Sequence, residues 1–250
     1  MVKTLKIHSI ETFGVHDGPG IRLVIFSQGC PFRCLYCHNP DTQALETAKT
    51  ETKTVDELIE LLEREKPYFG KNGHSGGLTV SGGEPTLQAK TITTLFRKAK
   101  ERGFHTCLDS CGAIVNKDVE ELYRFTDLLL LDVKHIDPLW HRRLVGQDNA
   151  KVLENAKIRE KSGREMWLRY VLVPGWTDQE KHLVAWAKYF AHFTTVSKVE
   201  ILPYHELGKH KYRELGREYL LADVKPPTME QIATAKEIFT KYLGNKVVVN

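Results

Sequence analysis

Three cysteines stand within eight residues of one another, in the segment Cys30-Pro-Phe-Arg-Cys34-Leu-Tyr-Cys37. The segment directly follows an apolar, β-branched run, which predicts a loop at the end of a strand. Thiolates are soft ligands, and a set as compact as this one suits an iron-sulfur cluster. A cluster of four irons usually takes four protein ligands, and the nearby sequence supplies three. One iron would therefore be left open for a substrate.

Other uses of the triplet are weaker. A structural zinc site would need a fourth ligand, and His38 is next to the last cysteine, but zinc ligands normally come as separated pairs. Three unrelated buried thiols would not need this spacing. A non-catalytic electron carrier or metal-binding module would bind no second ligand. It would leave the polar residues at the ends of the other predicted strands unexplained.

Polar residues also fall at the carboxyl ends of several other predicted strands. They are Ser81-Gly-Gly-Glu84, Asp109-Ser110, Asp132-Val133-Lys134 and Pro203-Tyr-His205. Active sites of barrels and open α/β sheets are built at this rim. Each group also has a plain alternative: the glycines make a turn, Asp132 and Lys134 mark a solvated strand end, and a lone histidine is structural. Their shared position is what predicts a site.

The elements that must position these residues alternate along the chain, as in a parallel sheet wrapped by helices. Predicted strands cover residues 5–10, 22–27, 78–81, 105–109, 128–133, 167–173, 199–202 and 247–249. Predicted amphipathic helices cover residues 55–65, 87–102, 150–161, 179–192 and 229–243. Thr54 and Thr228 precede two of the helices, each with a Glu or Gln three residues later, which predicts capping boxes.

Composition limits the class of protein. The 250 residues are 41% hydrophobic and 27% charged, which predicts one globular domain over residues 1–250. No apolar stretch approaches the roughly 20 residues of a membrane span, and no signal peptide is evident, so a cytoplasmic protein is expected. The net charge of +4 comes without a Lys/Arg run, which argues against nucleic acid as a partner. Five cysteines, an odd number, argue against a disulfide framework.

The C-x3-C-x2-C spacing with an aromatic residue before the last cysteine resembles the signature of the radical S-adenosylmethionine (SAM) superfamily. Four further segments resemble the activating enzymes of glycyl-radical enzymes: Asp17-Gly-Pro-Gly-Ile-Arg22, Tyr36-Cys-His-Asn39, Ser81-Gly-Gly-Glu-Pro85 and Leu202-Pro-Tyr-His-Glu-Leu-Gly-Lys-His210. The similarity runs over nearly the whole chain. Residues 38–106 contain no cysteine, so no ferredoxin-like insert with extra clusters is present, and the length exceeds that of the anaerobic ribonucleotide reductase activases. The resemblance is therefore to the pyruvate formate-lyase type.

This resemblance implies an α/β fold, a partial (β/α)6 TIM-like barrel of the radical SAM type. It implies one 4Fe-4S cluster and S-adenosylmethionine as co-substrate. A 5′-deoxyadenosyl radical would abstract a glycine Cα hydrogen from pyruvate formate-lyase and leave a glycyl radical there. Flavodoxin or ferredoxin is the implied electron donor, and a monomer is expected. The alternatives are activation of a different glycyl-radical enzyme and SAM-dependent attack on a small molecule.

The resemblance also implies roles for residues, with no catalytic group beyond the cluster and SAM. The cluster ligands are Cys30, Cys34 and Cys37. The implied SAM contacts are Tyr36, Cys37, His38, Gly82, Gly83, Glu84, Asp109, Asp132, Val133, Lys134, Arg169 and His205. An expected monovalent cation site comprises Asp109, Ser110, the carbonyl of Leu130 and Asp132.

Five further segments or residues are assigned from their positions. Arg169, a charge inside an apolar strand, either points into the barrel or belongs to a buried structural ion pair. Asp17–Arg22 and the loop from Gly70 to Gly77 are expected at the edges of a peptide groove. Cys107 and Cys111 are expected to be a packed thiol and a loop thiol.

Overall fold

A computed structural model describes residues 3–70 and 76–250 of the chain. Its strands are β1 (Thr4–Gly14), β2 (Arg22–Ser27), β3 (Glu51–Thr54), β4 (Gly77–Gly82), β5 (His105–Ser110), β6 (Leu128–Asp132), β7 (Met166–Leu172), β8 (Val196–Pro203) and β9 (Val247–Val249). Its α-helices are α1 (Val55–Glu65), α2 (Ala89–Glu101), α3 (Lys117–Arg124), α4 (Pro138–Val145), α5 (Ala150–Lys161), α6 (Glu180–Phe190), α7 (Lys209–Glu214) and α8 (Met229–Leu243). No helix in the described ranges is long and apolar enough to cross a membrane.

The predicted elements are all present, several with the predicted bounds and the others with ends shifted by a few residues. Both capping boxes are confirmed, because the Thr54 and Thr228 hydroxyls accept the backbone N–H of Glu57 and Gln231 and those side chains accept the threonine N–H in return. One predicted helix is divided, since residues 85–88 form a 3-10 turn ahead of α2. Strand β3 and helices α3, α4 and α7 were not predicted. Each is short, so it carries few turns of periodic pattern.

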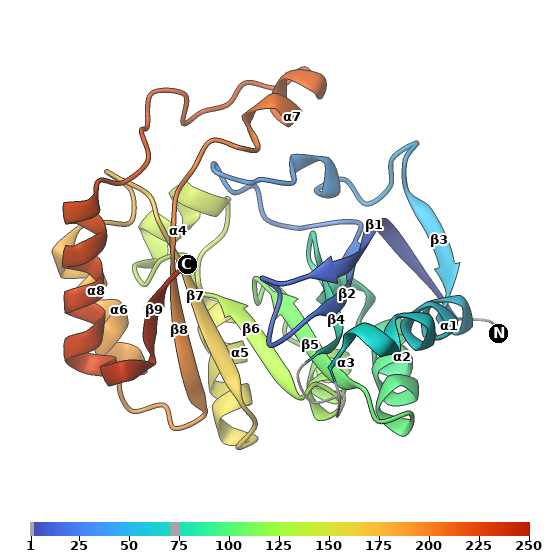
Figure 1. The fold of residues 1–250 in the computed structure, drawn as a ribbon. Helices are drawn as coiled ribbons and strands as arrows, with labels where there is room; N and C mark the ends of the chain where they lie inside the picture. Colours follow the sequence, from blue (N-terminus) through green and yellow to red (C-terminus); the bar gives the residue numbers. More distant parts are fainter. Residues whose placement is uncertain (1–2, 71–75) are drawn as a thin grey trace. The chain divides into compact units, whose positions relative to one another are not determined.

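The strands follow the order β3-β1-β2-β4-β5-β6-β7-β8-β9 (Figure 1). Strand β1 runs antiparallel to both β2 and β3, whereas β2, β4 and β5 are parallel to one another, as are β7, β8 and β9. The first and last strands of this order are not paired with each other, so the sheet is open. The prediction of an α/β fold with an incomplete barrel is confirmed.

Contacts within the chain divide it into two units. The first unit comprises Met1–Pro31 and Thr42–Leu130, and the second comprises Phe32–Asp41 and Leu131–Asn250. The cysteine triplet therefore contributes Cys30 to the first unit and Cys34 and Cys37 to the second. The single domain expected over residues 1–250 stays a prediction.

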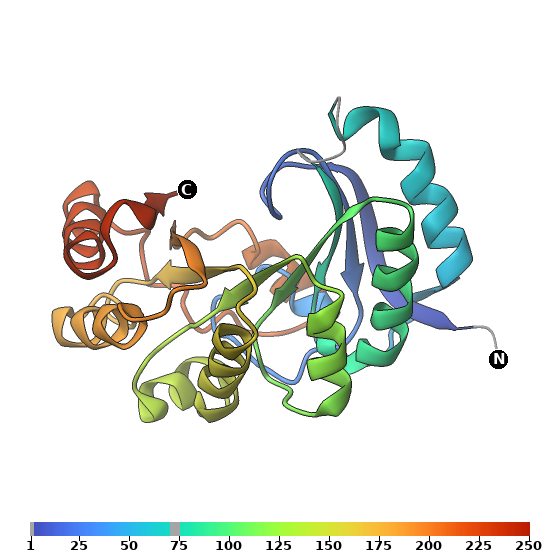
Figure 2. The ribbon, with the colours of Figure 1, turned by 90° about the horizontal axis from the view of Figure 1, so that it is seen from below.

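In the first unit, α1, α2 and α3 lie along one side of the strands (Figure 2). The apolar faces of α1 and α2 are buried there, with Leu58, Leu62, Ile92, Leu95 and Phe96 all fully covered. Strand β2 is buried on both faces, which is why it reads as a continuous apolar run rather than an alternating one. Burying a side chain of this size contributes about 1.5–3 kcal/mol, so this layer fixes the sheet firmly.

The core of the second unit is aromatic. Trp186 of α6 stacks on Phe239 of α8 with ring centroids 4.8 Å apart, and Tyr170 of β7 meets both rings edge-on at 5.4 and 5.2 Å. The Trp186 indole N–H donates to the carbonyl of Val133 at 3.1 Å, so a buried donor is satisfied. This bond ties α6 to the chain just after β6, where the site begins.

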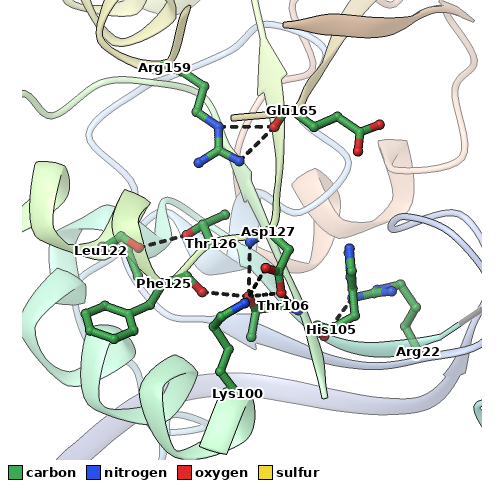
Figure 3. Close-up of polar contacts among 10 residues, drawn as sticks. All are labelled: Arg22, Lys100, His105, Thr106, Leu122, Phe125, Thr126, Asp127, Arg159 and Glu165. Carbon is green, nitrogen blue, oxygen red and sulfur yellow. Dashed lines mark hydrogen bonds and ion pairs between the residues drawn. The ribbon is translucent and has the colours of Figure 1, made fainter. Parts of the chain in front are cut away.

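Polar contacts hold the chain at the amino-terminal ends of β5, β6 and β7 (Figure 3). The Asp127 carboxylate, just before β6, accepts the backbone N–H and the hydroxyl of Thr106 at 3.0 Å each and pairs with Lys100 of α2. These donors hold the pKa of Asp127 below its ordinary value although burial would raise it. In the second unit, the fully buried Arg159 donates to the carbonyl of Glu165 at 3.1 and 2.7 Å. Polar contacts at these ends of the strands serve stability rather than chemistry.

Candidate functional site

Cys30 follows the end of β2, and backbone hydrogen bonds hold both Cys30 and the preceding Gly29. The N–H groups of Gly29 and Cys30 donate to the carbonyls of Thr42 and Gln43 at 2.8 and 3.2 Å. The carbonyl of Gly29 in turn accepts the N–H of Glu84 at 2.8 Å. Backbone hydrogen bonds within the first unit therefore fix the position of the first cysteine of the triplet.

The glycines of the loop Ser81–Glu84 are required by close backbone packing. A Cβ atom on Gly83 would lie 2.3 Å from the carbonyl oxygen of Gly29, and one on Gly82 would lie 2.3 Å from the nitrogen of Ser27. Gly82 also has a φ of 108°, in the region that favours glycine. The loop thus presses directly against the segment that leads to Cys30. This packing accounts for the glycine pair and leaves its ligand role a prediction.

Glu84 is fully buried and connects two strand ends. Its carboxylate accepts the N–H and hydroxyl of Thr86 at 3.0 and 2.5 Å, the hydroxyl of Ser110 at 2.8 Å and the N–H of Cys111 at 2.8 Å. A buried carboxylate is stable only when its oxygens are satisfied in this way. In this arrangement Glu84 fixes the exit of β5 beside the loop that follows β4.

The polar residues after β5 lie in the same unit. Asp109 accepts the hydroxyl of Ser81 at 2.8 Å. Cys107 is fully buried inside β5, and Cys111 is buried in the following loop, as predicted for a packed thiol and a loop thiol. Burial and a hydrogen bond with the Cys30 thiol raise the pKa of Cys111 well above its ordinary value. Cys111 is therefore the neighbour of the first cysteine, which the sequence did not indicate.

In the second unit, residues 32–41 form what we call the cysteine segment, which carries Cys34 and Cys37. The last turn of α4 holds it, because the N–H groups of Arg33 and Leu35 donate to the carbonyls of Val145 and Leu144 at 2.8 and 3.0 Å. Carbonyls in the last turn of a helix have no partner within the helix, so they are free to accept these bonds. The signal for α4 was present in the sequence: an Asp followed by a Pro, the pattern of an N-cap and first helical residue.

Lys134, Asp132 and Tyr36 lie together. The Lys134 ammonium donates to Asp132 at 2.9 Å and lies 5.6 Å from the centre of the Tyr36 ring. Burial would lower the pKa of Lys134, but the Asp132 carboxylate raises it well above its ordinary value. Burial likewise raises the pKa of Tyr36, whose hydroxyl is buried without a hydrogen-bond partner among the described residues. A cation and an unsatisfied hydroxyl beside Cys34 are suited to an anionic or polar ligand.

His38 and His205 stack on each other, with ring centroids 4.1 Å apart and ring planes 23° from parallel. His38 Nε2 donates to the carbonyl of His205 at 3.2 Å. Burial, followed by the neighbouring His205, lowers the pKa of His38. The structure thus joins the residue after Cys37 to the segment after β8, two of the places that the sequence singled out.

Arg169 of β7 takes part in a buried ion pair. Its Nε donates to Glu200 of β8 at 2.9 Å, and Glu200, 2% exposed, also accepts from Lys198 at 2.7 Å and from the Asn250 side chain at 2.8 Å. Of the two interpretations that the sequence left open, the structure shows the ion pair. A SAM contact for Arg169 stays a prediction.

The expected edges of a peptide groove and the expected cation site stay predictions. Arg22 is buried and donates to Thr79, to the carbonyl of Pro19 and to the carbonyl of Leu78, so it supports β4 rather than lining a groove. Residues 71–75 of the Gly70–Gly77 loop lie outside the described residues. Within either unit, no three His, Cys, Asp or Glu side chains of the described residues are grouped so that they could hold a metal ion, and the cysteine triplet itself is divided between the units. The cation site at Asp109, Ser110, Leu130 and Asp132 stays a prediction.

Comparison with known proteins identifies the family. The profile of the Radical SAM superfamily matches residues 24–187. Pyruvate formate-lyase-activating enzymes of Staphylococcus aureus are 45% identical over 235 residues, which is 92% of each chain. The chain belongs to the radical SAM superfamily, among the pyruvate formate-lyase-activating enzymes. The resemblance drawn from the motifs is confirmed.

Solved structures agree on the fold. A domain of pyruvate-formate lyase-activating enzyme from Bacteroides vulgatus covers 70% of this chain and 99% of its own, with 24% identity and a TM-score of 0.59. Streptococcus suis SuiB, solved with S-adenosylmethionine, covers 97% of this chain and 52% of its own, with 16% identity and a TM-score of 0.67. SuiB with its precursor peptide SuiA gives a TM-score of 0.69 at 16% identity, covering 97% of this chain and 50% of its own.

This radical SAM protein uses one 4Fe-4S cluster and S-adenosylmethionine, and its residues suit both. Three thiols within eight residues are the soft donors that such a cluster needs. In the second unit, the paired Lys134 ammonium and the unsatisfied Tyr36 hydroxyl provide polar groups for a ligand with a carboxylate. In the first unit, Gly82 and Gly83 are half-buried and carry no side chain beyond Cα, so a ligand could approach their backbone closely. The residues present therefore fit the two groups.

Two buried histidines, His135 and His182, predict a pH dependence of stability. The His135 and His182 rings lie 4.6 Å apart, and the Nε2 atoms of both are buried without a partner in the described ranges. Burial, reinforced by His182, lowers the pKa of His135 from 6.5 to about 4. The unfolded chain therefore binds an additional proton between these pH values, so the free energy of unfolding falls as the pH falls.

We expect this single group to contribute a loss of up to about 1.4 kcal/mol for each pH unit between about 6.5 and 4, levelling off below pH 4. Urea unfolding of the wild type and of His135→Asn across this range checks it. Asparagine keeps an acceptor for the N–H of Asp137, which His135 now accepts at 3.0 Å, but cannot titrate. Replacing the exposed His192 by asparagine is the control. Equal slopes in wild type and His135→Asn would contradict the assignment.

Proposed function

We propose that this protein activates pyruvate formate-lyase by producing a glycyl radical on it. The observation that carries the proposal is the 45% identity, over 92% of both chains, with Staphylococcus aureus enzymes of that name. A complete set of four motifs and the single cysteine triplet support it. The peptide-bound SuiB structure supports it further, because a related fold there receives a peptide.

Cys30, Cys34 and Cys37 would hold the cluster, which when reduced would supply the one electron that cleaves S-adenosylmethionine into methionine and a hydrogen-abstracting 5′-deoxyadenosyl radical. The protein's own contribution is to hold the reactants in place. Lys134, kept charged by Asp132, is positioned for a carboxylate, and Asp132 retains a second oxygen for a hydroxyl or ammonium. His38 and His205 offer a stacked pair of flat rings for a nucleoside.

In the first unit, the same proposal assigns the carbonyls around Gly82 and Gly83 to the amino group of the ligand. Glu84 acts there by holding the loop, since its oxygens already accept four hydrogen bonds. Asp109, Ser110, Leu130 and Asp132 are proposed for a monovalent cation, whose preference for hard oxygen ligands they would meet. The remaining proposed contacts are Tyr36, Cys37, Val133 and Arg169.

The wider setting belongs to the proposal as well. Flavodoxin or ferredoxin is proposed as the electron donor, in agreement with the mild positive charge of +4. The protein is proposed to act as a monomer in the cytoplasm, on a protein partner and without nucleic acid.

The test is an anaerobic assay of the reconstituted, reduced protein with S-adenosylmethionine. We expect 5′-deoxyadenosine that depends on the cluster and rises when a peptide from the glycine loop of pyruvate formate-lyase is added, together with the electron paramagnetic resonance signal of a glycyl radical. A peptide with that glycine changed to alanine is the control. Cleavage without any response to the peptide or to intact pyruvate formate-lyase would indicate another glycyl-radical partner. No cleavage, with zinc in place of iron, would return the triplet to a structural role.

A further inference from the structure

Helix α7 and the residue before it pack against the cysteine segment within the second unit. A Cβ atom on Gly208 would lie 2.7 Å from His38 Cα and 3.1 Å from the His38 carbonyl, so the two backbones touch. The φ of Gly208 is −78°, which any residue can adopt, so glycine is needed there for space alone. The Tyr212 hydroxyl donates to the carbonyl of Cys34 at 3.4 Å. Helix α7 and Gly208 therefore contact the backbone at Cys34 and at His38, the residue after Cys37.

Lys211 makes the strongest polar link between the two. Its ammonium donates to the side-chain oxygen of Asn39 at 2.9 Å and to the Asp41 carboxylate at 3.2 and 3.3 Å. Both partners follow Cys37 closely in the chain, whereas Lys211 is some 170 residues away. The Lys211 and Asp41 side chains are 25% and 28% exposed, so water screens this ion pair less than it screens a surface pair.

Three buried tyrosines give α7 a fixed position. The hydroxyls of Tyr204 and Tyr219 lie 2.7 Å apart, and the Tyr219 ring meets the Tyr212 ring edge-on with centroids 4.9 Å apart. The Arg217 guanidinium lies 5.3 Å from the centre of the Tyr212 ring. These tyrosine contacts hold α7 in place. Lys211 on this helix can therefore fix the position of the cysteine segment.

We propose that Lys211 is a positioning residue for the cluster: by binding Asn39 and Asp41 it holds the segment that carries Cys34 and Cys37 in the geometry that retains iron. The inference rests on the proposed cluster ligands. Lys211 acts through the segment and through no contact of its own with the cluster. Without the Lys211 bonds, the residues that follow Cys37 would lose their ion pair, and the segment would release metal more readily, as is typical when supporting groups around a metal site are removed.

The experiment compares the wild type with Lys211→Met after anaerobic reconstitution. We expect iron to be lost to a chelator about fivefold to tenfold faster from Lys211→Met, at or just below the lower end of the 10–100-fold that outer residues of metal sites typically contribute. We also expect a broadened electron paramagnetic resonance spectrum of the reduced cluster. Lys211→Arg, which can still reach both partners, should restore most of the retention. Lys209→Met is the matched control, because Lys209 lies on the same helix in an exposed pair with Glu206.

Asp41→Asn provides an independent variant should Lys211→Met not fold. It keeps the shape of the side chain and removes the ion pair, so we expect faster iron loss that does not add to the effect of Lys211→Met. Iron retention equal to the wild type in both variants, or equal acceleration by Lys209→Met, would overturn the positioning role alone. A wild-type chain that takes up no iron at all would overturn the proposed function along with it.

Discussion

Cys37→Ser is expected to fold normally and to lose the cluster. A serine hydroxyl at neutral pH is a harder and weaker ligand than a thiolate, and the compact triplet has no spare member. Removing one of three ligands should cost more than the 10–100-fold typical of residues that only support a ligand, so we expect cluster-dependent 5′-deoxyadenosine to fall by more than about 100-fold. Iron and acid-labile sulfide per chain, measured with product formation, check this directly.

Cys107→Ala is the control for the cysteine change. Cys107 is fully buried inside β5 and outside the triplet, so its replacement should lower stability slightly and leave iron content near the wild-type value. Full iron content and full product formation in Cys37→Ser would show that another residue completes the site. Cys111, which hydrogen-bonds to Cys30, would be the first to examine, by combining Cys37→Ser with Cys111→Ala.

The parts of the fold that the sequence predicted are those in which local pattern and tertiary burial agree. The strand over residues 22–27 and the helices over 55–65, 150–161 and 229–243 are found with the predicted bounds. Thr54 and Thr228 show why, since a capping box is a contact among four consecutive residues and needs no distant partner. Strand β3 has no such signal, because Glu51–Thr54 is polar and is defined by pairing with β1.

For the site, the sequence predicted positions better than contacts. Polar residues at the ends of β4, β5 and β6 do lie at strand ends, since strand direction follows from the α/β pattern. The bonds that Glu84 accepts from Ser110 and Cys111, the α4 carbonyls that hold Arg33 and Leu35, and the pairing of Lys211 with Asp41 all join residues distant in sequence. Periodicity and motif spacing carry no information on such pairs, so only the folded chain reveals them.

Glu84→Ala is expected to destabilise the fold strongly, whatever its effect on ligand binding. The change leaves the N–H groups of Thr86 and Cys111 and the hydroxyls of Thr86 and Ser110 without the acceptor that they share inside the protein. Each buried donor left unsatisfied costs about 1–3 kcal/mol, partly recovered by relaxation, so we expect a total loss of about 3 kcal/mol. For a chain of this length that corresponds to a melting temperature about 6–12 °C lower.

Calorimetry or circular dichroism of the cluster-free protein separates this structural role from a ligand contact, since neither cofactor is then present. The exposed Glu46, which pairs with Lys6 at the surface, provides the control: Glu46→Ala should leave the melting temperature unchanged. A Glu84→Ala protein that melts like the wild type but no longer binds S-adenosylmethionine would contradict the structural role and favour direct contact. Because the carboxylate's four bonds connect the exit of β5 to the loop beside Cys30, we expect the opposite: lower stability first, with weaker ligand binding as its consequence.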